Sequence, residues 1–476
     1  MTHTDAPHPR LDPKYRFLER RKTLATRPDV EHLANDIRHL LATAQTEQLR
    51  TLLHAEYPAD LADALSFLND AEDKTVFDLL EAAEAAEVLD EVDAETTARL
   101  VRGSSPERLA DILCELMPDE ATDIVSTFDA QTRERVLALL PAEEAEAIRT
   151  LLAYPKESAG GIMTSGFVAV PQTATQAETV RAFVNAPNAE HQFYIYALDE
   201  QGGITGVLDL RQLLRASPTT RIGDMMTGDV LHVPPDMDQE HVARLFSRYD
   251  LLMLPVVEPG TNRLLGVITA DDVIDVIEYE GTEDVLRTAG SDAQELERRS
   301  PTRIALLRLP WIMATMLIEL LAGVVIHVFD STLTQVILLA SFMPIISAIS
   351  GNTGLQSATI IVRGLSTGQV RLTRWRSALL RQVKTTLILG AAAGVVLGVI
   401  GGIWYGKLAF GLIILVGMFM AVNIAGIVGT IVPLISKSLG FDPALTSGPF
   451  ETAFQDVVGI SIFLSLATAL IKFLLS

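Results

Sequence analysis

Five long apolar stretches in the last third of the chain constrain its fold most strongly. Each contains the ~20 residues or more that an α-helix needs to cross the hydrocarbon core of a bilayer. The sequence therefore predicts a membrane domain of five helices, and it excludes a wholly soluble protein. The stretches cover residues 310–329, 333–362, 379–405, 408–435 and 449–475.

Charge is divided unevenly along the 476 residues, whose formal net charge is -22. Residues 310–476 contain nine basic and five acidic residues, a net charge of +4, which leaves -26 for residues 1–309. Binding of nucleic acid requires clustered Lys and Arg, so an acidic soluble region argues against a nucleic-acid partner. It favours cations as ligands instead.

Basic residues also predict the orientation in the membrane. The loop after the second apolar stretch is rich in arginine (Arg371, Arg374, Arg376), whereas the turn at residues 329–335 has no basic residue. The loop should be cytoplasmic, so the acidic N-terminal region is expected in the cytoplasm and the C-terminus outside. A single cysteine, Cys114, fits a reducing compartment, and the first thirty residues contain no apolar signal sequence.

Residues 31–155 contain a repeated, acid-rich unit that begins with proline. Proline suits the first turn of a helix, and apolar residues such as Leu61, Ala64, Leu65 and Leu68 have the spacing of one buried helix face. Stacked short helices of this kind predict an α-helical superhelix, although a protein-interaction scaffold with solvated acidic faces would give the same pattern. The units are Pro58–Leu65, Pro106–Leu113, Pro118–Val125 and Pro141–Ile148.

A second repeat lies at residues 156–281 and predicts an α+β fold. The motif Gly161-Ile162-Met163-Thr164 matches Asp224-Met225-Met226-Thr227, and Gly206-Val207-Leu208-Asp209 matches Gly266-Val267-Ile268-Thr269. The pattern resembles a tandem pair of CBS modules, here residues 156–217 and 218–281, a regulatory fold that often binds adenine nucleotides.

The resemblance implies one candidate nucleotide site for each chain. Such modules hold the nucleotide with a Thr or Ser after the last strand and an Asp three residues later, which the second module provides as Thr269 and Asp272. The first module has Asp209 and Gln212 at these positions. ATP is therefore a possible ligand of the second module, unless Thr269 only caps the helix that follows it.

Three acidic residues inside the apolar stretches are functional candidates, because charges are costly in a bilayer. They are Glu319, Glu451 and Asp456. Asp456 follows Thr452 by one helical turn, so the carboxylate and the hydroxyl share a helix face and could share a lumen. Alternatively, Asp456 only hydrogen-bonds a neighbouring helix. Glu451 is about 140° round the helix from Asp456 and is expected to face elsewhere.

The second apolar stretch contains an unusual polar and glycine-rich run, Ser350-Gly351-Asn352-Thr353-Gly354-Leu355-Gln356-Ser357. A lipid-facing helix would not have this composition. The run indicates either a broken helix at a water-filled path or a closely packed helix interface.

These motifs together resemble the MgtE family of magnesium transporters over about residues 31–476. The run from Gly351 to Gln356 is similar to the second-span signature of that family, and Asp442-Pro443-Ala444-Leu445 with Asp456-Val457-Val458-Gly459 is similar to its fifth-span signature. The chain departs from the family pattern at Ser350, Leu355 and Glu451.

The resemblance implies a homodimeric, multi-pass protein of the inner membrane that conducts Mg²⁺ along the subunit interface, with Asp456 and Thr452 at the ion. It also implies a flexible tail at residues 1–30, a connecting helix at residues 282–305 whose segment 285–302 acts as a gate, and a membrane domain at residues 306–476. Feedback by cytosolic Mg²⁺ would close the gate. The matching regulatory carboxylates are Glu87, Asp119, Asp123, Asp250, Asp272, Asp275, Glu280, Glu283 and Asp284.

Other functions remain open at this point. The ion could be another divalent cation such as Co²⁺ or Mn²⁺, or the chain could be a membrane-anchored nucleotide sensor that conducts nothing. The acidic residues could also form a solvated surface without specific ligands. An enzyme is not expected, because the sequence contains no Walker A loop, no nucleophile elbow and no HExxH motif.

Overall fold

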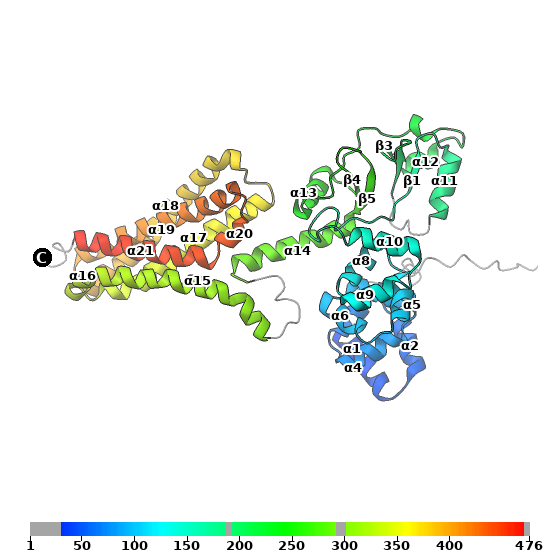
Figure 1. Cartoon of the computed structure of the whole chain (residues 1–476). Helices are drawn as coiled ribbons and strands as arrows, with labels where there is room; N and C mark the ends of the chain where they lie inside the picture. Colours follow the sequence, from blue (N-terminus) through cyan, green and yellow to red (C-terminus); the bar gives the residue numbers. More distant parts are fainter. Residues whose placement is uncertain (1–29, 187–192, 292–300, 471–476) are drawn as a thin grey trace, which may run out of the picture. The chain divides into compact units, whose positions relative to one another are not determined.

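The computed structural model describes residues 30–186, 193–291 and 301–470, and it divides into two compact units. The first unit is Met1–Ile277 and the second is Glu278–Ser476. The first contains a helical N domain and an α+β region, and the second contains the long apolar helices (Figure 1). The predicted fold class, with a helical superhelix, tandem CBS modules and a five-helix membrane domain, is confirmed.

The N domain consists of short helices that pack in an alternating order. Helix α1 contacts α3, α3 contacts α5, α5 contacts α7 and α7 contacts α9, which gives a superhelix with one continuous apolar core. The bounds are α1 Val30–Ala42, α2 Thr46–Ala55, α3 Pro58–Leu65, α4 Asp70–Leu79, α5 Ala82–Glu91, α6 Ala94–Val101, α7 Pro106–Leu113, α8 Pro118–Ser126, α9 Ala130–Leu137 and α10 Ala142–Leu151.

Proline starts three of these helices as predicted. Pro58, Pro106 and Pro118 are the first residues of α3, α7 and α8. The fourth predicted unit begins one residue late, because Pro141 has a ψ of 142°, which is outside the helical region, and so precedes α10 as its N-cap.

The α+β region contains two small sheets. In the first, β1 pairs parallel to β2, which pairs antiparallel to β3; in the second, β4 pairs antiparallel to β5. The bounds are β1 Ala169–Pro171, α11 Gln176–Asn185, β2 Tyr194–Leu198, β3 Ile204–Asp209, α12 Leu210–Arg215, η3 Ile222–Asp224, α13 Gln239–Tyr249, β4 Met253–Val257 and β5 Leu264–Thr269.

The two modules exchange their first motifs. Thr164 of the first module bridges to Val267 of the second, and Thr227 of the second bridges to Val207 of the first. Glycine permits both crossings. A Cβ atom at Gly206 would lie 2.4 Å from the Met226 sulfur, and one at Gly266 would lie 2.8 Å from the Met163 sulfur. The sequence repeat thus corresponds to a structural pseudo-symmetry.

A single helix, α14 (Ala270–Thr288), follows the last strand. The sequence predicted a separate connecting helix over residues 282–305. Instead, its first residues belong to α14, because no proline interrupts the helix after Ala270, and its last residues belong to α15. Residues 292–300, which include most of the predicted gating segment, lie outside the described residues.

The second unit contains the five helices that are long and apolar enough to cross a membrane. The second span begins at Leu339 rather than near residue 333, because Val336, with φ -137° and ψ 74°, ends the short preceding helix. The bounds are α15 Pro301–Val328, α16 Asp330–Gln335, α17 Leu339–Ser366, η5 Leu372–Arg374, α18 Trp375–Tyr405, α19 Leu408–Ser438, α20 Pro443–Thr446 and α21 Pro449–Ala469.

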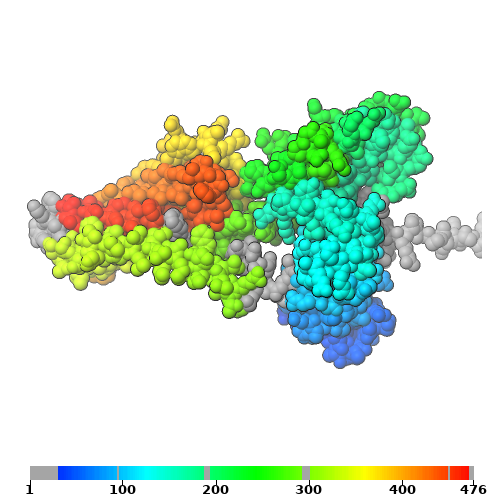
Figure 2. All heavy atoms as spheres, viewed as in Figure 1, coloured from blue at the N-terminus to red at the C-terminus, as the bar shows by residue number. Residues whose placement is uncertain are grey.

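Small residues bring these helices into close contact. Helix α19 packs against α17, α18 and α21, and α15 lies along α21 (Figure 2). A Cβ atom at Gly411 of α19 would lie 2.5 Å from the Gly398 carbonyl of α18, and one at Gly429 would lie 2.3 Å from the Gly354 carbonyl of α17. Glycine at these crossings allows backbone-to-backbone approach, as is common between membrane helices.

Candidate functional site

Asp456 of α21 faces α17, where the polar run lies. The Ser347 hydroxyl donates a hydrogen bond to Asp456 Oδ1 over 2.5 Å. Gly351 lies closest to Thr452, because a Cβ atom there would lie 3.2 Å from Thr452 Cγ2, whereas its distance of 3.7 Å to Asp456 Oδ1 would be an ordinary contact. Helices α17 and α21 thus place the predicted pair, Thr452 and Asp456, beside the glycine motif.

A second carboxyl group, from Glu319 of α15, lies close enough to Asp456 for the two to interact electrostatically. Three helices therefore bring two carboxyl groups and the Ser347 hydroxyl together, a set of oxygen donors that suits a hard divalent cation. In the described part of this one chain, no group of three or more His, Cys, Asp or Glu residues forms a metal site. Two carboxyl groups alone do not enclose an ion, so a complete site requires waters or further ligands.

Glu451 is buried in the seam between α17 and α21. Only 1 % of the residue is exposed, and Gln455 Nε2 donates to its Oε1 over 3.0 Å. The same oxygen lies against Gly354, where a Cβ atom would come within 2.2 Å of it. Among the described residues, Glu451 Oε2 has no hydrogen-bond partner. Glu451 therefore faces the Gly354 seam rather than lipid.

The polar run of α17 is an intact helix. Ser350, Thr353 and Ser357 are buried, and their hydroxyls donate to the backbone carbonyls of Ser347, Ile349 and Thr353 in the same helix. Their hydrogen-bonding capacity is thus used locally, and the glycines between them provide close packing. Within this one chain the run is therefore a continuous, closely packed helix and not a broken one.

Two predicted regulatory carboxylates, Asp119 of α8 and Asp272 of α14, lie close enough to interact. Burial raises the pKa of the Asp119 carboxyl to about 6, although a hydrogen bond from Thr164 opposes the shift. Burial, and then the charge of Asp119, raise the pKa of Asp272 well above its usual range. One helical turn from Asp119, burial also raises the pKa of Asp123, and Lys156 opposes it from 4.0 Å. Burial is the main cause of all three pKa shifts, and the mutual repulsion of Asp119 and Asp272 adds to it, so the charged forms are disfavoured while no cation lies between them.

Thr269 stands directly before α14, and its hydroxyl donates to Asp272 Oδ2 over 2.5 Å. The two residues predicted to hold a nucleotide are therefore in contact with each other. This bond joins two side chains, whereas a helix cap would accept from a backbone amide, so it does not decide between capping and nucleotide binding.

The remaining predicted carboxylates lie at separate positions. Asp250 ends α13 in a left-handed conformation with φ 52° and is exposed, and Glu87 lies on α5. The others are spread along α14. These are Asp275, Glu280, Glu283 and Asp284.

The end of α14 contacts the membrane helices through a cation that the sequence analysis missed. Arg287 Nη1 donates to Asp442 Oδ2 over 2.6 Å, and Arg287 also pairs with Glu283 one turn earlier. Burial raises the pKa of Asp284 nearby, and the charge of Asp442 adds to the shift while Ser366 and Arg363 oppose it. In the sequence, the one feature that points to Arg287 is its position four residues after Glu283, the spacing at which opposite charges pair on a helix.

Comparison with known proteins adds family matches over most of the chain. The model for the MgtE divalent cation transporter matches residues 343–466, that for the MgtE intracellular N domain matches residues 56–157, and the CBS domain matches residues 159–219 and 222–279. The first range includes Ser347 and Asp456 but not Glu319 of α15.

Similar proteins are known from several bacteria. The magnesium transporter MgtE of Thermus thermophilus is 37% identical over 343 residues, which are 71% of this chain and 76% of that protein. The magnesium transporter MgtE of Bacillus subtilis is 36% identical over 336 residues, 70% of this chain and 74% of that protein. A crystal structure of the cytosolic domain of the Mg²⁺ channel MgtE in complex with ATP is 38% identical and covers 51% of this chain and 99% of its own, with a TM-score of 0.49.

The helical N domain, the CBS pair and the five apolar helices define a multi-pass membrane protein with attached regulatory modules. Within that class, the identity to curated relatives over more than two thirds of both chains decides the family. The chain belongs to the MgtE family.

Proposed function

We propose that the protein is a Mg²⁺-selective channel or transporter of the inner membrane, with its N-terminus in the cytoplasm, its C-terminus outside, and feedback control by cytosolic Mg²⁺. The observation that carries the proposal is the position of Asp456, which lies beside Ser347 of α17 and Glu319 of α15. Mg²⁺ loses its waters reluctantly and is usually bound by one or two carboxylates that leave several waters in place.

A homodimer would complete the ion site. The described chain brings together two carboxyl groups, and a two-fold axis beside α17 and α21 would double that number and place two Asp456 side chains across a lumen. Thr452, next to Gly351 on the same helix face as Asp456, adds a hydroxyl near the ion path.

Feedback control follows from the repulsion between acidic residues. Asp119 and Asp272 interact unfavourably without a cation, so bound Mg²⁺ stabilises the packed arrangement of the N domain and the CBS pair. Glu87, Asp123, Asp250, Asp275, Glu280, Glu283 and Asp284 are further proposed ligands. Mg²⁺ therefore shifts the population towards the closed state, because it binds that state more tightly.

Ion uptake into proteoliposomes tests the transport function. Asp456→Ala should abolish Mg²⁺ uptake and leave expression and dimerisation unchanged. Asp330→Asn, which neutralises an acid of α16 away from the proposed path, is the matched control. Near wild-type uptake by Asp456→Ala would refute the ion site. Parallel uptake of Co²⁺ and Mn²⁺ measures selectivity, and absence of any uptake by the wild type would support a sensor instead.

Limited proteolysis tests the gate. Mg²⁺ should protect residues 278–303 from cleavage in the wild type but not after joint neutralisation of Asp250, Asp275, Glu280, Glu283 and Asp284. The same variant should stay open at Mg²⁺ concentrations that close the wild type, because Mg²⁺ requires oriented oxygen ligands. Equal protection by Na⁺ at matched ionic strength would show that screening alone is responsible.

ATP binding at the CBS pair is a further part of the proposal. Thr269 and Asp272 stand after the last strand of the second module, where the resemblance to CBS modules places a nucleotide. ATP would have to replace the hydrogen bond between their side chains. Calorimetric titration with ATP, compared between the wild type and Thr269→Val, tests this, and equal affinity would exclude Thr269 from the site.

A further inference from the structure

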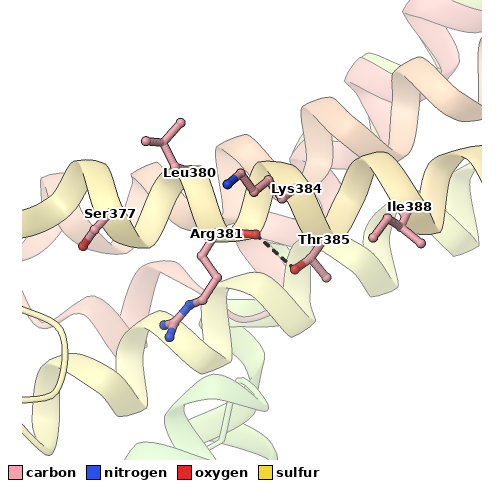
Figure 3. Close-up of a pocket in the computed structure, with 6 residues that line it drawn as sticks. All are labelled: Ser377, Leu380, Arg381, Lys384, Thr385 and Ile388. Atoms are coloured by element: carbon pink, nitrogen blue, oxygen red, sulfur yellow. Dashed lines mark hydrogen bonds between the residues drawn. The ribbon is translucent and has the colours of Figure 1, made fainter.

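An exposed face near the start of α18 combines positive charge with apolar surface. Six residues, all from this one helix, line a shallow, open hollow with a volume of about 500 Å³ (Figure 3). Arg381 and Lys384 provide its charge, and Leu380 and Ile388 provide apolar surface that is 60% and 72% exposed. The other two lining residues are Ser377 and Thr385.

The two cations lie at the edge of the hydrocarbon core. Trp375 and Trp404 near the ends of α18 are exposed and 29 residues apart, which is about 44 Å of helix and matches the ~40–45 Å between membrane interfaces. Tryptophan is enriched at these interfaces. Arg381 and Lys384 are six and nine residues further in, about 9 Å and 14 Å, so their long side chains can reach back to the phosphate level.

No carboxylate neutralises these cations within the described part of the chain. The salt bridges of the described residues include neither Arg381 nor Lys384. The five acidic residues of 310–476 are placed elsewhere: Asp442 pairs with Arg287, Glu451 is buried in its seam, and Glu319 lies near Asp456. The fifth, Asp330, is in α16, which the chain order places at the opposite end of the spans. Within the described residues, the two cations are therefore available to an external anion.

The hydroxyl groups in the hollow do not supply donors to a ligand. Ser377 donates to the Arg374 carbonyl and Thr385 donates to the Arg381 carbonyl, the bond drawn in Figure 3. Recognition thus depends on the two cations, and the apolar half of the hollow requires an apolar occupant. A small soluble anion would leave Leu380 and Ile388 uncovered.

We propose that this face binds one anionic phospholipid, with its phosphate between Arg381 and Lys384 and an acyl chain along Leu380 and Ile388. A headgroup with net negative charge fits two cations better than a zwitterionic headgroup does. The acidic cytosolic region is a less suitable occupant, because it would leave the apolar half exposed. A second copy of the membrane domain has few acidic residues to offer this face.

Native mass spectrometry of the full-length protein in detergent tests the site. Titration with phosphatidylglycerol should show binding that Arg381→Gln/Lys384→Gln weakens by about 30-fold, the effect expected from two charges near an anionic lipid. The matched control, Lys407→Gln/Lys437→Gln, removes two charges elsewhere and should bind like the wild type. Arg381→Lys/Lys384→Arg keeps both charges and should retain binding, which separates loss of charge from misfolding.

Two further arms distinguish the occupants. Phosphatidylcholine should bind less than phosphatidylglycerol, and glycerol phosphate should not compete, because it lacks the acyl chains. Equal binding of both lipids, competition by glycerol phosphate, or an equal loss in the control variant would each overturn the proposal. A change in the Mg²⁺ response of the Gln variant with unchanged lipid binding would assign the face to the acidic cytosolic region instead.

Discussion

Arg287 near the end of α14 is joined to Asp442 by a 2.6 Å hydrogen bond between oppositely charged groups. Asp442 also caps α20, because its Oδ1 accepts a hydrogen bond from the Ala444 amide. Helix α20 leads directly into α21, which carries Asp456. The carboxylate of Asp442 thus connects the helix after the CBS pair to the span that holds the proposed ion ligand.

Removal of this ion pair should weaken the proposed control of ion flux by Mg²⁺. We expect Arg287→Ala to raise the Mg²⁺ concentration for half-closure by up to about fivefold, because a partly exposed ion pair contributes ~1 kcal/mol or less. Patch-clamp recording or flux at graded cytosolic Mg²⁺ measures the shift. A double-mutant cycle with Asp442→Asn is the control, and additive effects of the two changes would show that the pair has no coupling role.

The repulsion between Asp119 and Asp272 predicts an effect on stability. Asp119→Asn/Asp272→Asn should raise the unfolding temperature of the metal-free protein, because it removes two buried charges that face each other. It should also reduce the increase in unfolding temperature that Mg²⁺ causes in the wild type. Thermal unfolding with and without Mg²⁺ gives both values. Substitution of the exposed Asp78 and Asp236 by Asn is the control, and an unchanged Mg²⁺ response in the first variant would contradict the proposed bridge.

The contact between Gly354 and Glu451 predicts a specific steric effect. Gly354→Ala should destabilise the membrane domain by ~1–3 kcal/mol, because its Cβ would lie 2.2 Å from Glu451 Oε1. Glu451→Ala should relieve the clash, so the double variant should be more stable than Gly354→Ala alone. Detergent-solubilised protein, heated and analysed by size exclusion, gives the midpoint temperatures. An equal loss of stability in the single and double variants would show that the effect does not arise at this contact.

Cys114 should react unusually slowly with alkylating reagents. Partial burial, together with the Glu144 carboxyl, raises the pKa of its thiol to about 12. Only the thiolate reacts, so at pH 8 about one molecule in 10,000 is reactive, and the rate should rise about tenfold for each pH unit up to about pH 11. Glu144→Gln removes one cause of the shift and should accelerate the reaction. Labelling at pH 8 as fast as that of a peptide thiol would contradict the predicted pKa.

Much of the architecture could be predicted from local sequence signals. Pro58, Pro106 and Pro118 mark helix starts because the missing amide hydrogen costs nothing in the first turn. The four-residue motifs Gly206–Asp209 and Gly266–Thr269 mark the last strand of each module. Lengths of apolar sequence predicted all five spans, with starts that differ from the observed ones by up to nine residues. These features depend on the backbone and on hydropathy, which short stretches of sequence determine.

The contacts of the candidate sites could not be predicted in the same way. Arg287 and Asp442 are 155 residues apart in sequence, and their pairing depends on how α14 meets α20. The position of Glu451 against Gly354 likewise requires the crossing of α17 and α21. Helical periodicity places Glu451 away from Asp456 but does not specify which neighbour it meets. Long-range packing determines such pairs, and one sequence contains no direct signal for them.

The exchange of motifs between the CBS modules has a consequence for synthesis on the ribosome. Thr164 pairs with Val267, so its bridging partner emerges about 100 residues later. Chain synthesis adds ~5–20 residues per second, so the segment near Thr164 remains without its bridging partner for about 5–20 seconds. During that interval the nascent first module has an unpaired edge, to which other chains or a chaperone have access. Translation speed across residues 164–267 therefore affects the yield of correctly folded protein.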